Sequence, residues 1–319
     1  MSASSSAAAA AVAPVLAAAS SSSTNASSKP SAVYLVDLQN KQRLVALQRR
    51  NAEMLKICEE FSSYAVSPKG LDAYCWHLMG LAKRDVEMIS EARESLARSV
   101  ELQPLNMSAW SELANLCENL QNISSLEQRF RANGTPDLIV NLFKAAAFMR
   151  INSNDEAKQL YSTLIAMIPK SRYIAGQLAL VNNNLREYNE AERILEQLRV
   201  EDPFDLDHVD VLSNCLYLGE KSVELAALAK ESEDIDPWRP ESCLAAGNYY
   251  SLKGKHEEAV LCFERAAKVH PSNPSPYILM GHEFLELKNI SACVKAYRTA
   301  TEIYDMDYRA WFGLGQAYD

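Results

Sequence analysis

Four polar side chains recur at intervals of 34 residues in the second half of the chain: Asn214, Asn248, His282 and Gln316. Side chains that donate and accept hydrogen bonds, set in a row, could bind the N–H and C=O groups of an extended peptide. Each one alone is better explained as a polar residue on a solvated face, so the hypothesis rests on the four together. Arg309 could add a charged contact and Tyr217 an aromatic one. These six residues form the predicted peptide groove.

Motifs for catalysis or metal binding are not found in the sequence. There is no phosphate-binding GxxxxGK loop, no GxGxxG and no GxSxG. His256-Glu257 comes nearest to the HExxH zinc motif, but Val260 stands where the second histidine would be. The seven cysteines contain no CxxC pair, which is typical of reduced thiols in the cytosol or nucleus. We therefore expect no enzyme activity, no cofactor and no metal site.

Charge and hydropathy argue against nucleic-acid and membrane partners. The net charge is −9, and non-specific binding to phosphate needs clustered Lys and Arg. The apolar run from Ala7 to Ala19 is interrupted by Pro14 and has no basic residue before it, so a disordered tail is favoured over a signal peptide. A plastid transit peptide is the weaker alternative, because the first arginine is Arg43. We expect a protein of the nucleus and cytoplasm.

A repeat of 34 residues organises most of the chain. Prolines end four successive units, at Pro169, Pro203, Pro237 and Pro271. Within each unit small residues alternate with bulky ones at the places where two packed helices need close approach, which is typical of the tetratricopeptide repeat. Unit 240–273 is the clearest, with Cys243, Ala246, Gly247, Tyr250, Ala259, Phe263, Ala266 and Pro271. We predict an all-α protein, a tetratricopeptide-repeat superhelix (α-solenoid) with a disordered N-terminal tail.

This pattern divides the chain into three regions. Residues 1–32 are rich in Ser and Ala and should be disordered. Residues 33–171 hold an N-terminal helix and the first repeats, including an irregular repeat at 107–137 that is three residues short. Residues 172–319 are regular repeats, the last of which has only its first helix. Because arrays normally close with a capping helix, we expect the chain to be a fragment or a truncated gene model of a longer protein.

From about Ala73 onward the sequence resembles one tetratricopeptide family closely, subunit eight of the anaphase-promoting complex (cyclosome). The matching runs include residues that the repeat alone does not require, such as His282-Glu283. The sister family, subunit three, is similar through the same runs. Two features favour subunit eight: Trp110-Ser111-Glu112-Leu113 before the irregular repeat, and the run from Ser213 to Tyr217. The runs that carry the resemblance are Arg239-Pro240-Glu241-Ser242-Cys243, Gly247-Asn248-Tyr249-Tyr250-Ser251-Leu252, Leu279-Met280-Gly281-His282-Glu283-Phe284 and Asp307-Tyr308-Arg309-Ala310-Trp311-Phe312-Gly313-Leu314-Gly315-Gln316.

The resemblance implies a non-catalytic scaffold in a ubiquitin ligase that controls mitotic progression. It implies a homodimer formed through the N-terminal repeats, contacts with other subunits of the complex, and a groove for a co-activator peptide motif near Arg309 and Gln316. The alternatives are subunit three or a generic peptide-binding repeat adaptor. An adaptor that grips an acidic tail needs Lys or Arg at the fifth position of each repeat. Here that position holds Gly176, Asp210, Leu244, Ile278 and Phe312.

Overall fold

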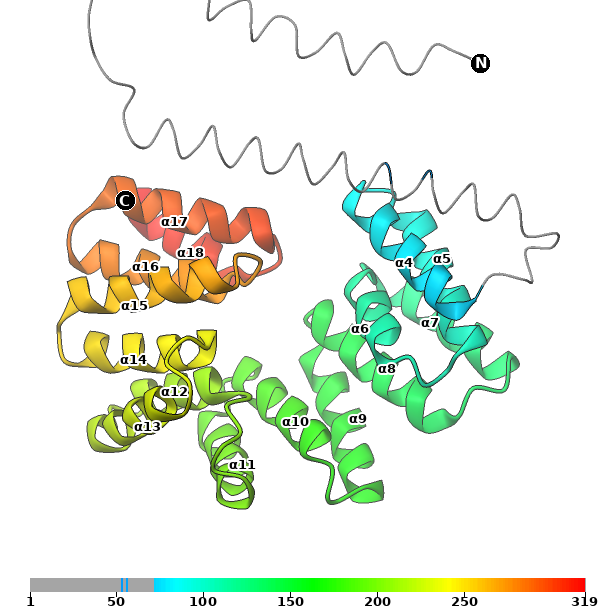
Figure 1. Ribbon diagram of the computed structural model, residues 1–319, viewed down its shortest axis with the longest axis horizontal. Helices are drawn as coiled ribbons and strands as arrows, with labels where there is room; N and C mark the ends of the chain where they lie inside the picture. The colour runs from blue at the N-terminus through cyan, green and yellow to red at the C-terminus, as the bar shows by residue number, and fades with distance from the viewer. Residues whose placement is uncertain (1–52, 54–55, 57–71, 319) are drawn as a thin grey trace, which may run out of the picture. The chain divides into compact units, whose positions relative to one another are not determined.

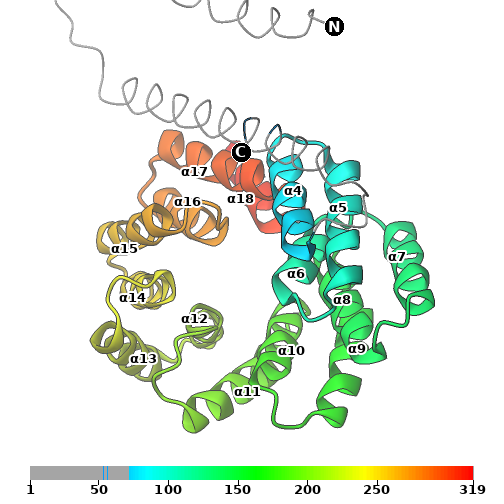
Figure 2. The same cartoon turned by 45° about the vertical axis from the view of Figure 1, so that its right-hand side comes forward.

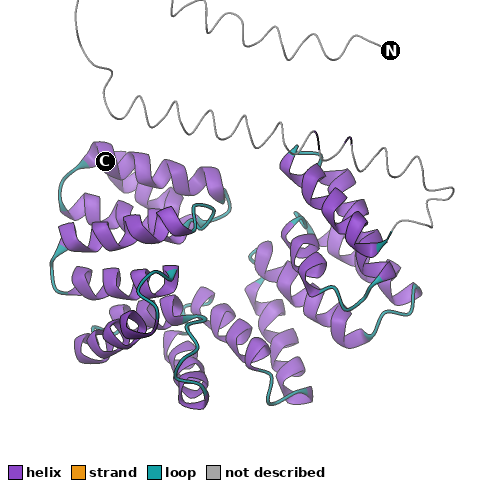
Figure 3. Ribbon diagram, in the orientation of Figure 1, coloured by secondary structure: helices purple, strands orange, loops and turns teal. Residues whose placement is uncertain are grey.

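The computed structural model describes residues 53, 56 and 72–318. The chain divides into two units, Met1–Phe61 and Ser62–Asp319, and the repeat helices lie in the second. The described residues of this unit form helices joined by turns, without a strand, so the predicted all-α class is confirmed (Figure 3). The predicted tail (1–32) and nearly all of the predicted N-terminal helix lie outside the described residues. The helices are α4 (Ala73–Asp85), α5 (Ile89–Leu102), α6 (Met107–Asn115), α7 (Leu120–Ala132), α8 (Asp137–Arg150), α9 (Asn154–Met167), α10 (Arg172–Asn184), α11 (Tyr188–Glu201), α12 (Val209–Leu218), α13 (Ser222–Ile235), α14 (Pro240–Leu252), α15 (His256–Val269), α16 (Ser275–Glu286), α17 (Ile290–Ile303) and α18 (Tyr308–Tyr318).

Each repeat supplies a pair of helices, and successive pairs stack side by side into an arc (Figure 1). The first helix of each pair lies on the inner side of the arc. This is clearest for α10, α12 and α14, while α11, α13 and α15 lie outside them (Figure 2). Side chains on the first helices therefore form the concave face.

Close approach of the paired helices explains the glycines at the eighth position of the repeats. A Cβ on Gly247 would lie 2.2 Å from Cε1 of Phe263, and one on Gly281 would lie 2.5 Å from Cε1 of Tyr297. Both rings are fully buried. The ring fills the space that the missing side chain leaves, so the alternation of small and bulky residues is a packing requirement.

The turn inside each regular repeat has a left-handed residue at its fifteenth position. Six such residues have φ between 54° and 70°. In each case the next N–H donates to the carbonyl five residues back, as Lys255 does to Tyr250, which is the usual way to end a helix with an αL residue. Only one of the six is a glycine. The residues are Glu87, Asn152, Arg186, Glu220, Gly254 and Lys288.

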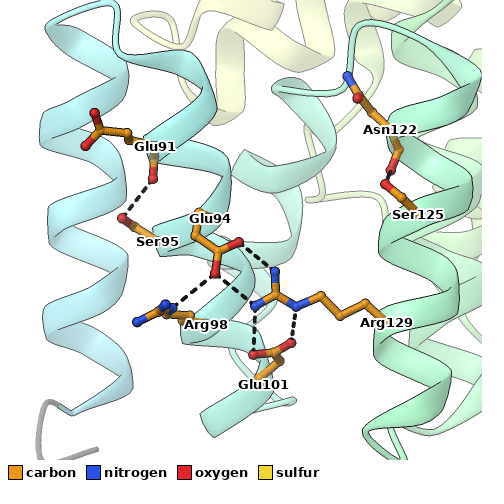
Figure 4. Close-up of polar contacts among 8 residues, drawn as sticks. All are labelled: Glu91, Glu94, Ser95, Arg98, Glu101, Asn122, Ser125 and Arg129. Carbon is orange, nitrogen blue, oxygen red and sulfur yellow. Dashed lines mark hydrogen bonds and ion pairs between the residues drawn. The ribbon is translucent and has the colours of Figure 1, made fainter. Parts of the chain in front are cut away.

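The irregular repeat is held by an aromatic cluster and an ion-pair network. Its first helix, α6, has only 9 residues. Trp110 packs edge-on against Phe130 with ring centroids 4.7 Å apart, and both contact Phe143. Arg129 on α7 donates to Glu94 on α5 at 2.6 Å and also to Glu101 (Figure 4). These contacts join the shortened repeat to its neighbours.

Candidate functional site

A central cavity of about 690 Å³ lies on the concave face of the described residues. Its floor comes from α6, α8, α10 and α12, and its opposite wall from the turn between α17 and α18. Seven amide side chains line it: Asn115, Asn152, Asn154, Gln177, Asn183, Asn184 and Asn214. Four tyrosines and two arginines complete the polar lining: Tyr173, Tyr188, Tyr304, Tyr308, Arg150 and Arg309. Amides, phenols and guanidinium groups are well suited to the backbone and polar side chains of an extended peptide.

The cavity is closed on one side by contacts between turns far apart in the sequence. The Tyr304 hydroxyl donates to the carbonyl of Arg150 at 3.1 Å, and the Arg150 guanidinium lies 4.1 Å from the centroid of the Tyr304 ring. Asn152 donates to the carbonyl of Met306 at 3.3 Å. The chain therefore curves enough for the α17–α18 turn to contact the α8–α9 turn.

The six residues of the predicted peptide groove do not share one environment. Asn214 and Arg309 both line the central cavity. Asn248 is only 3% exposed and donates to Ser213 Oγ at 2.9 Å. His282 Nδ1 lies 2.8 Å from the hydroxyl of Tyr297.

The remaining two residues of the predicted groove also lie apart from the cavity lining. Tyr217 is half-buried and its hydroxyl hydrogen-bonds to Ser251 Oγ at 3.3 Å. Gln316 is exposed on α18. The structure thus brings two of the six together, engages three in contacts inside the stack, and leaves one on the surface. Peptide binding by these residues stays a prediction.

A polar chain links three successive repeats beside the cavity. Ser251 on α14 donates to Glu283 on α16 at 2.7 Å, and the other carboxylate oxygen of Glu283 lies 2.7 Å from His256 Nδ1 at the start of α15. Glu283 is 5% exposed, so these partners are needed to offset the cost of burying a carboxylate. The chain fixes how one repeat sits on the next.

Burial and charge set the protonation of the groups near the cavity. Burial lowers the pKa of His282, and the nearby Arg309 lowers it further, so the neutral imidazole is favoured. Burial alone would lower the pKa of Arg309, but its hydrogen bonds to Asp307 raise it overall. Burial raises the pKa of Tyr304, against the opposing effect of Arg150. At neutral pH the cavity presents two cations and one carboxylate.

An apolar pocket of about 300 Å³ continues the concave face toward the N-terminal repeats. Met107, Trp110, Leu142 and Phe143 line it, and it shares Tyr173 with the central cavity. Met107 is 45% exposed although it is a large apolar residue. The concave face therefore changes from apolar in the first repeats to polar in the later ones.

Several cavity residues were missed from sequence. Tyr173 and Asn183 stand at the second and twelfth positions of unit 172–205, so the same groove positions that selected Arg309 and Tyr217 would have selected them. Arg150 and Tyr304 lie in or beside turns that are 154 residues apart, and no periodic signal joins them.

Over the described part of the chain, no group of three or more His, Cys, Asp or Glu side chains could hold a metal ion. The search for a helix long and apolar enough to cross a membrane, made on the same residues, finds none.

Comparison with known proteins follows the same division of the chain. Residues 37–179 match the family model of anaphase promoting complex subunit 8 / Cdc23, and residues 240–273 match a tetratricopeptide repeat. Anaphase-promoting complex subunit 8 of Arabidopsis thaliana is 39% identical over 222 residues, 70% of this chain and 37% of the relative. The subunit 8 of Dictyostelium discoideum is 36% identical over 245 residues, 74% of this chain and 40% of the relative.

The solved structures agree on the fold. A crystal structure of the APC/C hetero-tetramer Cut9-Hcn1 superposes with a TM-score of 0.62 at 18% identity, covering 77% of this chain and 48% of that one. The chain spans less than half the length of the curated relatives it matches. It is a tetratricopeptide-repeat protein of the anaphase-promoting complex subunit 8 / Cdc23 family, whose family model covers residues 37–179.

Proposed function

We propose that this chain is a non-catalytic scaffold subunit of the anaphase-promoting complex, a ubiquitin ligase that controls mitotic progression. In this role it homodimerises and binds neighbouring subunits and a co-activator peptide in the nucleus and cytoplasm. The observation that carries the proposal is the match of residues 37–179 to the subunit 8 family, together with a concave face that offers binding surfaces. Subunit eight is favoured over subunit three because it is the subunit 8 model that matches.

The co-activator peptide is assigned to the central cavity around Asn214 and Arg309. The cavity is large enough for several residues of an extended chain, and its amides can satisfy a peptide backbone. Arg309 is 43% exposed and already oriented by Asp307, so its free N–H groups are held in place for a ligand. The assignment moves Gln316 to the margin of the site.

Peptide binding is tested by fluorescence anisotropy with a labelled co-activator motif peptide and the full chain. Arg309→Ala and Asn214→Ala should each weaken binding about tenfold, since each removes polar contacts that only the bound peptide completes. Lys268→Ala is the matched control, because its side chain is 78% exposed on α15, outside the cavity lining. Equal affinity of the parent and both cavity variants would reject this site.

Homodimerisation is assigned to residues 33–171. The apolar pocket around Met107 and Leu142 supplies exposed apolar surface there, which association would remove from water. Light scattering of the chain should give the mass of a dimer at micromolar concentration, and Met107→Asp should shift it toward the monomer. A parent chain that is monomeric throughout this range contradicts the assignment, while leaving the peptide site open to its own test.

A further inference from the structure

Exposed apolar side chains gather at two neighbouring turns outside the central cavity. Phe204 lies in the α11–α12 turn and Trp238 in the α13–α14 turn, each directly after the proline that ends its repeat. Their exposed fractions are 77% and 70%, and that of Val200, at the end of α11, is 82%. Large apolar residues that cluster on a surface mark interaction sites. We call Val200, Phe204 and Trp238 the aromatic edge.

Hydrogen bonds and ion pairs hold the two turns rigid. The side chain of Asp202 accepts from the N–H of Phe204 at 3.2 Å, and that of Asp236 accepts from the N–H of Trp238 at 2.9 Å. Arg239, next to Trp238, pairs with Asp207 in the preceding turn, so the turns lie side by side. Rigid presentation lowers the entropy cost of binding a partner there.

Two hollows flank the aromatic edge. The first, about 140 Å³, is lined by Asp202, Asp205 and Arg199 beside the turn of Phe204. The second, about 360 Å³, is lined by Pro237 and the helices that follow it. Arg199 donates through Nη2 to Glu231, but its buried Nη1 has no hydrogen-bond partner among the described residues. A buried donor without a partner is costly, and a carbonyl of a bound chain would satisfy it.

The charge around the aromatic edge is strongly negative. Residues 196–207 contain five carboxylates and one arginine, and residues 230–239 contain four carboxylates and two basic residues. Three of the carboxylates, those of Glu201, Glu233 and Asp234, are exposed and make no ion pair with another described residue. Aromatic faces also attract cations, as Arg265 shows by lying 5.7 Å from the centroid of the Trp238 ring.

We propose that the aromatic edge binds an extended segment of a partner protein that carries Lys or Arg between apolar residues. The apolar side chains pack on Phe204, Trp238 and Val200, and the cations face the flanking carboxylates and the free faces of the rings. A backbone carbonyl of the segment accepts from Nη1 of Arg199. This site lies away from the central cavity, so it does not depend on the co-activator assignment.

The test uses the full chain and two fluorescein-labelled peptides, four repeats of Arg-Leu-Gly and four repeats of Glu-Leu-Gly, in fluorescence anisotropy. The basic peptide should bind at least about tenfold tighter than the acidic one, and its affinity should fall with salt because exposed charges are screened. The double variant Phe204→Ser/Trp238→Ser should bind the basic peptide at least about tenfold more weakly than the parent. Glu201→Lys/Asp234→Lys should also weaken binding.

Val223→Ser is the matched control. Val223 is 82% exposed like Val200, but it lies at the start of α13, the far end of that helix from the turn of Trp238. Its affinity should equal that of the parent, and all variants should keep the parent's far-ultraviolet circular dichroism. Equal binding of both peptides, or unchanged binding by the double aromatic variant, overturns the proposal. So does a change of mass in sedimentation when the aromatic pair is replaced, because the occupant is then a second copy of this chain.

Discussion

The packing of Phe263 against Gly247 makes a sharp prediction about stability. In Gly247→Ala, the new methyl group would stand 2.2 Å from one ring atom of Phe263 and 2.6 Å from the next. Ordinary contacts between carbon atoms begin near 3.4 Å, so the ring or the helix must move by about 1 Å. Phe263 is fully buried and packs against Cys243 and Met280, which leaves it no free volume.

The expected cost follows from two opposing effects. Overpacking a close-packed core typically destabilises by about 1–3 kcal/mol. Alanine is a better helix former than glycine by about 1 kcal/mol, which offsets part of that cost. Gly247→Ala should therefore lower the free energy of unfolding by about 1–2 kcal/mol. Urea unfolding followed by circular dichroism at 222 nm measures this as a lower denaturation midpoint.

The same substitution elsewhere in the chain supplies the control. Gly315 lies in α18, where an added Cβ would have no heavy atom within 4 Å. Gly315→Ala should raise the free energy of unfolding by about 0.5–1 kcal/mol, because only the helix propensity changes. The double variant Gly247→Ala/Phe263→Leu should be more stable than the sum of its two single changes predicts. If Gly247→Ala is as stable as the parent, the close-packing explanation of the repeat pattern is wrong.

Three further predictions concern the turns and the concave face. Gly254→Ala should destabilise by about 1 kcal/mol because its φ is +70°, and Lys288→Gly, at φ +57° in the next repeat, should be neutral or stabilising; both are measured by urea unfolding. Asn248→Ala should cost about 1–3 kcal/mol of unfolding free energy, since it leaves the buried Ser213 hydroxyl without its partner, whereas a residue used only for ligand binding would change stability little. Burial depresses the pKa of His282 in the folded state, so its contribution to stability is complete above the unfolded pKa of 6.5 and decreases as the pH falls below it; His282→Gln should flatten the dependence of the denaturation midpoint between pH 7.5 and 5.5.

The sequence allowed the helices and their pairing to be predicted because a repeat writes the same packing problem several times. Gly247 and Phe263 carry little information alone, but Gly281 and Tyr297 repeat them 34 residues later. The left-handed turn residues could not be found in the same way. Only Gly254 carries a sequence signal for positive φ, and the equivalent Lys288 adopts it because the neighbouring helices impose it.

Curvature is the quantity that single repeats do not encode. Each repeat rotates slightly on the one before it, and the small rotations add up over the array. They bring Tyr304 to Arg150, a contact that depends on every repeat between them. For this reason the position of Asn214 in the central cavity was within reach of sequence reasoning, while the opposite wall of that cavity was not.

The polar residues of the concave face have two separate uses, which their positions in the repeat do not distinguish. Asn248 bonds to Ser213 in the preceding repeat, and Ser251 bonds to Glu283 in the following one. These residues join neighbouring first helices and so fix the angle between repeats. Asn214, at the same position as Asn248, remains free to face the cavity. The polar ladder that periodicity suggests is therefore partly a structural brace, and the width of the cavity depends on the residues that have no access to a ligand.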